Sequence, residues 1–302
     1  MNVTVVLVTY NRLKDLRGTL QAYEGQTCPP REVIVVDNHS TDGTVDFLRE
    51  WEGEQGAFRR TVCLLPENIG GSGGFAHGMT EALKTDCDWV FVADDDAVPH
   101  ADMLEKLAAF AEKEPALTAG AAALCTAVNN RGRHTGVHRC RLYKTPIGNL
   151  EITASEKDFE KEYFFIDFYS FVGALIRKTA LAQAGVARAD FFIYNDDYEH
   201  ALRVGRYGKL ICVPAAVMDH VDNLQPQFEA TWRDYYGTRN AVIMHREHFG
   251  RYAAFWRAAR RLAMGVKSGN PKKVRVIWDA IRDAYAGKTG LHPVYKPGWK
   301  AQ

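Results

Sequence analysis

Three consecutive carboxylates, Asp94, Asp95 and Asp96, directly follow the apolar run 89–93. The run is β-branched, aromatic and uncharged, which indicates a short buried strand. Three like charges at a strand end repel one another unless a cation neutralises them, and carboxylate oxygens suit Mg²⁺ or Mn²⁺. Asp94 and Asp96 project from one side of an extended chain, so they can hold one ion together. The alternative is a solvated acidic turn that caps a helix beginning near His100.

Strands alternating with helices would position this triplet. Apolar runs predict strands at 3–8, 33–36 and 62–65, in addition to 89–93. Helical periodicity separates the first three, at 13–23 and 45–51. This order predicts a parallel sheet covered by helices on both faces, and ligands of such sheets bind beyond the carboxyl ends of the strands.

Polar side chains follow two more of these strands. Thr9, Tyr10 and Asn11 come after the first strand, and Asp37 and Asn38 come after the second. Each group alone could be ordinary loop chemistry. Because the carboxyl ends of parallel strands meet at one edge, we expect these groups and the triplet to converge on one crevice. The convergence favours a nucleotide site.

The order of the motifs resembles that of glycosyltransferase family 2, whose members have the GT-A fold. Besides the motifs above, the resemblance rests on NIGGSGGF at 68–75, FIYNDDYE at 192–199, His220 and YYGTRN at 235–240. Together these span most of residues 1–245. The GGSGGF run and the Asp triplet are most similar to the galactofuranosyltransferase branch, and the Tyr-Tyr and Arg-Asn pairs also recur in rhamnosyltransferases.

The resemblance implies roles for the motif residues. Asp94, Asp96 and His220 would hold Mn²⁺ or Mg²⁺, with Asp95 nearer the ribose or the donor sugar. Apart from the family, a lone histidine such as His220 is more often structural. The donor nucleotide would be contacted by Thr9, Tyr10, Asn11, Asp37, Asn38, Asn68, Gly71 and Gly73. The glycine run lacks the lysine of a P-loop and the spacing of a dinucleotide fingerprint, and its alternative is a flexible turn before a helix.

The motif at 192–199 matches the acidic motif that carries the base in inverting members. We assign the base to Asp197, with Asp196 as its rival or as a ligand of another acceptor hydroxyl. The alternative is a helix start in which early acids suit the helix dipole. The resemblance also implies acceptor contacts from Tyr169, Phe171 and Glu199. Related galactofuranosyltransferases have tryptophans near the first two. Arg203 lies four residues after Glu199, which predicts a structural pair.

Charge divides the chain. Residues 233–302 contain 15 Lys and Arg against 4 Asp and Glu, whereas residues 1–232 contain 23 against 33. We therefore expect a GT-A catalytic domain at 1–232, with a nucleotide-sugar half at about 1–125 and an acceptor half at about 126–232, followed by a basic helical region at 233–302. Residues 126–165 are the least readable and could form a mobile flap.

The basic region predicts helices at 235–249, 252–266 and 272–285, punctuated by Gly250 and Pro271. Its expected basic belt consists of Arg257, Arg260, Arg261, Lys267, Lys272, Lys273 and Arg275, interleaved with Tyr252, Phe255, Trp256 and Trp278. One interpretation is a surface for an anionic membrane or a diphosphate-linked acceptor. The other is a solvated bundle that packs on the body or forms a homo-oligomer. No nucleic-acid motif accompanies the charge.

The expected protein is an α/β enzyme of the cytoplasm, peripheral at the inner face of the membrane if the belt binds lipid. No apolar run has the length of a signal or a span, and six scattered cysteines fit a reducing compartment. The resemblance favours UDP-galactofuranose as donor, with dTDP-rhamnose second, and a glycan or lipid-linked acceptor. Alternatives of another class are a non-catalytic nucleotide-sugar-binding protein and a nucleotidyltransferase, which would carry a basic glycine-rich loop where Thr9–Asn11 stand.

Overall fold

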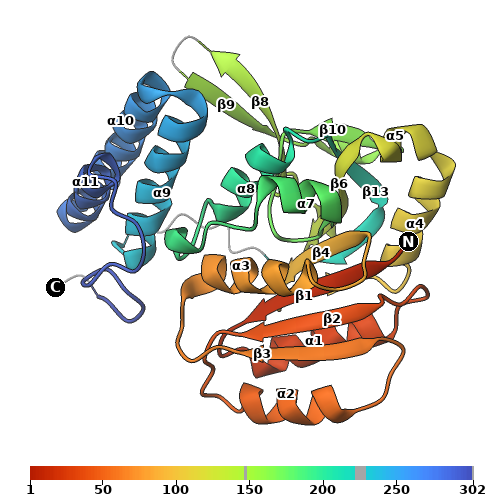
Figure 1. The fold of residues 1–302 in the computed structure, drawn as a ribbon. Helices are drawn as coiled ribbons and strands as arrows, with labels where there is room; N and C mark the ends of the chain where they lie inside the picture. Colours follow the sequence, from red (N-terminus) through yellow and green to blue (C-terminus); the bar gives the residue numbers. More distant parts are fainter. Residues whose placement is uncertain (146–147, 222–228, 301–302) are drawn as a thin grey trace.

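A computed structural model describes residues 1–145, 148–221 and 229–300 (Figure 1). Its first half is a four-stranded parallel sheet in the order β3-β2-β1-β4. The strands are β1 (Val3–Thr9), β2 (Glu32–Asp37), β3 (Arg59–Leu64) and β4 (Trp89–Asp94). All four predicted strands are present, and the predicted parallel sheet is confirmed in this half.

Helices cover both faces of this sheet, as Figure 1 shows. They are α1 (Leu13–Glu24), α2 (Thr44–Gly53) and α3 (Gly70–Ala82). The alternation of side chains along β1 divides the core: Val6 and Val8 pack on the α3 side, whereas Val5 and Leu7 pack with α1 and α2. A strand buried on both faces reads as a continuous apolar run, which explains why the sequence shows it clearly.

The glycine run is part of α3, so the alternative of a flexible turn before that helix is wrong. A Cβ on Gly74 would lie 2.5 Å from Val8, and one on Gly78 would lie 2.3 Å from Val6. These glycines therefore let the helix approach the sheet closely.

The second half extends the sheet with mixed strand directions, giving the order β10-β13-β6-β12-β4. β12 runs antiparallel to β4 and β6, while β13 runs parallel to β6. The strands are β5 (Val98–Pro99), β6 (Ala121–Asn130), β7 (Arg133–His134), β10 (Phe164–Ile166), β12 (Ala174–Arg177) and β13 (Lys209–Asp219). The helical segments here are α4 (Met103–Lys113), α5 (Pro115–Ala119), α6 (Glu156–Phe159), α7 (Lys178–Ala184), η1 (Ala189–Phe191) and α8 (Asp196–Val204).

Residues 126–165, expected to form a flap, contribute most of a second small sheet in their described part. Its order is β11-β8-β9, from β8 (Arg139–Thr145), β9 (Gly148–Thr153) and β11 (Phe168–Tyr169). The buried guanidinium of Arg139 secures the base of β8, because it donates to the carbonyls of Thr126, Val172 and Gly173 at 2.7–3.0 Å.

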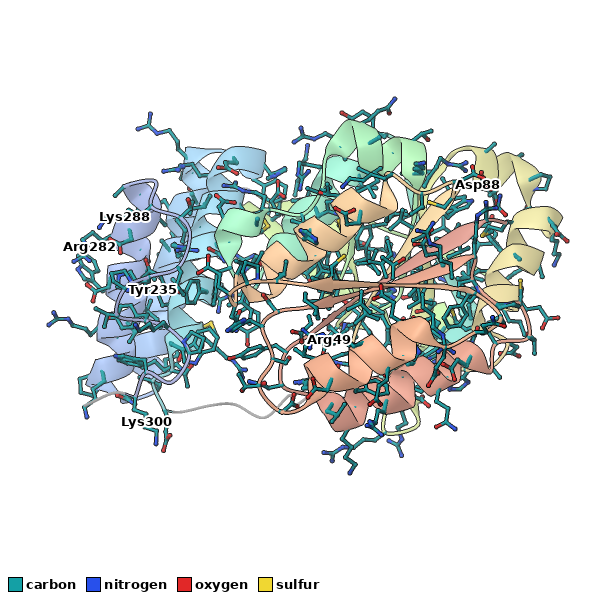
Figure 2. All side chains as sticks on the ribbon, turned by 60° about the horizontal axis from the view of Figure 1, so that its bottom comes forward. Arg49, Asp88, Tyr235, Arg282, Lys288 and Lys300 are labelled. Atoms are coloured by element: carbon teal, nitrogen blue, oxygen red, sulfur yellow. The ribbon has the colours of Figure 1, made fainter. Side chains whose placement is uncertain are left out.

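Three helices form a C-terminal bundle beside the catalytic body (Figure 1). They are α9 (Trp232–Phe249), α10 (Arg251–Lys267) and α11 (Pro271–Tyr285), which confirms the three predicted helices. Figure 2 shows Tyr235 within the bundle, where its hydroxyl donates to the buried carboxylate of Asp283 at 3.0 Å. Lys288 pairs with the same carboxylate at 3.0 Å. Over the described residues, no helix combines the length and apolarity that crossing a membrane requires.

Candidate active site

The structure brings together the three residues expected to hold a metal. One ligand atom each from Asp94, Asp96 and His220 lies within 4.8 Å of the others. Asp94 ends β4, and β5 follows the triplet and pairs with the end of β13, where Asp219 lies opposite Val98. This pairing carries His220 to the triplet from 124 residues away along the chain. The helix expected near His100 begins only at Met103, so the triplet does not cap it.

The charges in this cluster call for a cation. Burial and the neighbouring Asp96 charge raise the pKa of Asp94 to about 7. Burial also acts on Asp96, but hydrogen bonding to His220 and the charge of Arg12 hold its pKa below the ordinary value. The Nε2 atom of His220 lies 3.3 Å from Asp96. Two carboxylates and an imidazole within reach of one point fit a divalent ion such as Mn²⁺.

Asp95 faces a different environment from its two neighbours. It is buried, and its carboxylate accepts the hydroxyl of Thr9 at 2.6 Å. Its backbone carbonyl accepts the hydroxyl of Thr19 at 2.7 Å. Burial raises the pKa of Asp95 to about 6, although the Thr9 hydrogen bond opposes the shift. Asp95 therefore ties the ends of β1 and β4 together at the site.

Arg12 is a component of the site that sequence reasoning missed. Its guanidinium contacts Asp96 and lies 3.4 Å from Asp95. Only its place directly after Asn11, at the end of β1, could have indicated it. The guanidinium of Arg12 therefore places a positive charge beside the three carboxylates.

The other residues after β1 and β2 form a polar rim. Asn11 adopts a left-handed backbone conformation and accepts the backbone N–H of Thr41 at 2.7 Å. Tyr10 is exposed. Asp37 is buried and accepts the backbone N–H of Ser40 at 2.9 Å through one oxygen. Its other oxygen is buried as well and has no hydrogen-bond partner among the described residues.

Asn38 and Asn68 shape the start of α3. The Asn38 amide donates to the carbonyl of Gly70 at 2.8 Å and accepts the N–H of Ile69 at 3.0 Å. Asn68 accepts the N–H of Gly70 at 2.9 Å. A Cβ on Gly73 would collide with Ile69 at 2.7 Å, whereas one on Gly71 would meet open space. Gly71 is therefore the predicted glycine that faces a free volume.

Asp196 and Asp197 begin α8, so the helix-start interpretation is correct as far as it goes. Asp197 keeps part of its surface accessible, whereas Asp196 is buried. Burial raises the pKa of both groups, and the charge of Asp196 raises that of Asp197 further. The charge of Asp94 also raises the pKa of Asp197. A carboxyl with a raised pKa in a water-poor site suits proton transfer.

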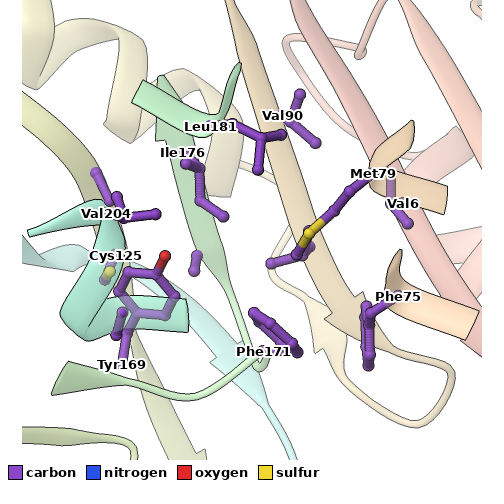
Figure 3. Packing of buried hydrophobic residues seen from close by; sticks show 14 of the residues in the cluster. Val6, Phe75, Met79, Val90, Cys125, Tyr169, Phe171, Ile176, Leu181 and Val204 are labelled. Atoms are coloured by element: carbon purple, nitrogen blue, oxygen red, sulfur yellow. The ribbon is translucent and has the colours of Figure 1, made fainter. Parts of the chain in front are cut away.

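The three residues expected at the acceptor have packing roles in this structure. Tyr169 is fully buried, and its hydroxyl lies 3.1 Å from Nδ1 of His200. Phe171 packs against Phe75 with ring centroids 4.7 Å apart; Figure 3 shows these residues in the core. Glu199 is also buried and pairs with Arg203 at 2.9 Å and His248 at 3.1 Å. These side chains offer an acceptor no open surface, because the core and the ion pairs occupy them.

Only some residues of the expected basic belt are exposed to solvent. Arg257 is mostly buried; it contacts Glu151 and donates to Nε2 of His245 at 2.9 Å. Lys273 pairs with Asp234 at 3.2 Å, and Arg261 is half-buried. The expected cations that remain exposed are Arg260, Lys267, Lys272 and Arg275. The prediction of a continuous exposed belt is therefore wrong for Arg257, Arg261 and Lys273, which are partly or mostly buried.

A cavity of about 820 Å³ opens between β9 and α10, and neither acidic cluster contributes to its lining. Its walls are mainly apolar and include Leu150, Trp256, Ala259 and Ala263, with Arg257 and Arg260 contributing cations. The exposed aromatic residues Tyr252, Phe255 and Trp278 lie on the same two helices as Arg260 and the exposed cations of α11. The exposed surface of these two helices is therefore amphipathic.

A parallel first half of the sheet, a mixed second half and an acidic cluster at the strand ends define a GT-A glycosyltransferase. The comparisons with known proteins establish the family. The model described as "Glycosyl transferase family 2" matches residues 4–185, and the chain belongs to that family.

Its relatives include galactofuranosyltransferases. GlfT1 of Mycobacterium tuberculosis is 32% identical over 209 residues, which are 68% of this chain and 66% of the relative. GlfT1 of Mycolicibacterium smegmatis is 27% identical over 207 residues, with the same coverage. The match thus spans slightly less than two thirds of the length of these relatives.

Solved structures share the fold at low sequence identity. A structure of GalNAc-T7 with UDP, GalNAc and Mn²⁺ aligns with a TM-score of 0.62 and 13% identity, over 95% of this chain and 56% of that one. The mannosyltransferase PcManGT of Pyrobaculum calidifontis, in complex with GDP-Man and Mn²⁺, gives 0.58 and 19%, over 97% and 76%. TarS of S. aureus gives 0.55 and 15%, over 93% and 71%.

Proposed function

We propose that this enzyme transfers galactofuranose from UDP-galactofuranose to a glycan acceptor, with inversion at the anomeric carbon. The observation that carries the mechanism is the convergence of Asp94, Asp96 and His220, whose ligand atoms lie within 4.8 Å of one another. The identity to GlfT1 over two thirds of the chain supports the donor. A dTDP-rhamnose donor is the second candidate. Membership of a glycosyltransferase family leaves no reason to retain a nucleotidyltransferase or a pure binding protein.

The residues divide the work as follows. Asp94, Asp96 and His220 would hold a divalent ion, which when bound neutralises the diphosphate of the leaving nucleotide. Asp37, at the end of β2, would lie on the nucleobase side of the site, and the open face at Gly71 would admit the donor. Asp197 would take the proton of the acceptor hydroxyl as that hydroxyl attacks the anomeric carbon. One base and one displacement give inversion, without a covalent intermediate.

A panel of nucleotide sugars tests the donor. With Mn²⁺ present, UDP-galactofuranose is expected to raise the melting temperature more than dTDP-rhamnose does, because a ligand of the native state stabilises it by mass action. NMR of the anomeric centre of the product then decides the stereochemistry. Retention of configuration, or protection by dTDP-rhamnose alone, would contradict this proposal.

For the acceptor, the amphipathic face of α10 and α11 supports a lipid-linked glycan at an anionic membrane. The apolar cavity beside Trp256 and Arg260 would receive part of the lipid, and exposed cations would meet headgroups. Each basic residue near such a surface contributes about 1 kcal/mol, less at high salt. We expect the enzyme to sediment with vesicles that contain anionic lipid at low salt and to be released at high salt.

Charge reversal makes the membrane test specific. Arg260→Glu combined with Lys267→Glu should abolish sedimentation and leave UDP binding unchanged. Arg49→Glu combined with Lys106→Glu is the matched control, since both residues are exposed on α2 and α4 of the catalytic body. Equal loss in the two double variants, or no sedimentation by the parent, would contradict a membrane role for this face.

A further inference from the structure

The segment just before the catalytic acids has an unusual backbone. Phe192, Tyr194 and Asn195 all have positive φ angles, between 63° and 69°. Each such residue is strained and persists only where the surroundings enforce it. Asn195 is the N-cap of α8, so the path of this segment fixes where Asp196 and Asp197 stand.

One side chain of the C-terminal bundle gathers the carbonyls of this segment. The amide nitrogen of Asn240, on α9, lies 2.9 Å from each of the carbonyl oxygens of Phe191, Ile193 and Tyr194. Asn240 is fully buried. Three backbone acceptors converging on one amide hold the segment in the path that its left-handed residues require.

Arg239 reinforces the same contact. Its guanidinium donates to the amide oxygen of Asn240 at 2.9 Å and to the carbonyls of Phe191 and Gly290 at 3.1 and 2.7 Å. It is almost fully buried and lies over the ring of Tyr236. Removing a cation from water is costly unless hydrogen bonds compensate for it. The carbonyls that accept from Arg239 provide those bonds, and the guanidinium in turn holds the carbonyls in place.

The nucleotide half closes on the segment from the opposite side. The backbone N–H of Ser72, in the first turn of α3, donates to the carbonyl of Phe192 at 3.2 Å. A Cβ on Gly70 would lie 2.0 Å from that same oxygen. The segment is therefore held between the first turn of α3 and the buried face of α9.

From this arrangement we infer that Arg239 and Asn240 are positioning residues for the transfer reaction: they set the place of Asp196 and Asp197 relative to Asp94. The inference rests on the proposed function and extends it, because it makes α9 a part of the catalytic unit. The predicted division at residue 232 separates groups that act together. The competing account is that the pair only fastens the bundle to the body.

The sharpest test is Asn240→Asp, which keeps the shape and the bond to Arg239 but replaces the donor with an oxygen facing three carbonyls. Misplacing the catalytic acids by about 1 Å is expected to lower kcat on the order of tenfold to a hundredfold, with the KM for the donor and UDP binding within about twofold of the parent. Ile277→Ala is the control for stability, because Ile277 packs under Gly265 of α10. At a similar loss of stability it should keep the parent kcat.

Two further variants keep the proposal testable if Asn240→Asp does not fold. Arg239→Lys retains the charge without the fork, and Gly70→Ala displaces Phe192 from the other side. Both should speed amide hydrogen exchange at 191–197 and lower kcat, and Arg239→Lys should also spare UDP binding. The proposal is overturned by parent-like kcat in these variants, by equal loss in Ile277→Ala, or by a matching loss of UDP binding in Arg239→Lys. If the parent transfers no sugar, the proposed function fails while the exchange experiment still tests the positioning.

Discussion

The two acidic clusters of this enzyme differ in what surrounds them. Asp94, Asp95 and Asp96 end a buried strand next to Arg12 and His220, and the pKa of Asp96 is held low. Asp196 and Asp197 begin a helix after a left-handed turn, and burial together with neighbouring acids raises their pKa values. Burial raises the pKa of Asp94 and Asp95 as well, so the difference lies in Asp96, which His220 and Arg12 keep charged for a cation. In the second cluster both acids favour taking up a proton. The same residue type thus serves two purposes according to its environment.

The largest expected effect is at the first cluster. Asp96→Ala should abolish transfer and weaken UDP binding, because the diphosphate loses the ion that neutralises it. Excess chelator should have the same effect on the parent, and added Mn²⁺ or Mg²⁺ should reverse it. Asp102→Asn, the loss of a half-buried acid at the N-cap of α4, is the control and should be silent, because asparagine is an equally good N-cap residue. Full turnover in excess chelator would contradict a metal-binding role for the first cluster.

At the second cluster, Asp197→Asn should lower kcat about a hundredfold or more, since the amide cannot accept a proton. Metal and UDP binding should persist. In the parent, kcat should fall as the pH drops through the raised pKa of the base, because the protonated acid is inactive, and this limb should vanish in Asp197→Asn. If Asp196→Asn proves inactive while Asp197→Asn is near normal, the two roles are exchanged.

A smaller effect is expected two residues further on, at Glu199. Burial would raise its pKa, but hydrogen bonds from His248 and Arg203 lower it to about 2. A lowered carboxyl pKa stabilises the fold above the ordinary value of 4.5, and that stability is lost as the pH falls toward 2. Glu199→Gln should cost roughly 2–3 kcal/mol at pH 7, less at acid pH, and spare kcat.

Urea unfolding at several pH values measures this cost. The gap between the parent and Glu199→Gln should narrow as the pH falls below 4.5. A large loss of kcat with unchanged stability would instead return Glu199 to the acceptor site. Asp196, Asp197 and Glu199, all on α8, would then all act on the acceptor.

The parallel first half of the sheet could be predicted because its signals are local. A strand buried on both faces is apolar throughout, and parallel strands bring their carboxyl ends together, so the convergence of Thr9, Asp37 and Asp94 followed from order alone. The helices of the bundle could be predicted because Gly250 and Pro271, which mark their ends, are also local signals.

The rest depends on partners distant in the sequence. Arg12 meets acids more than 80 residues away, and Arg257 turns inward because Glu151, on β9, lies opposite it. No pattern in the sequence around Tyr169 indicates that its hydroxyl pairs with His200, and none around Glu199 indicates that its carboxylate pairs with His248. Such contacts arise from the packing of separate elements, which a single sequence does not display.

The salt bridge of Arg12 bears on the order in which ligands assemble. A free Mn²⁺ ion has to displace the guanidinium from Asp96, whereas an ion that arrives with a diphosphate brings an anion for that guanidinium to meet. Calorimetric titration should therefore show weak binding of Mn²⁺ alone and strong synergy with UDP. Arg12→Ala should tighten binding of the bare ion and reduce the synergy, which would make Arg12 a gatekeeper that reserves the site for the loaded donor.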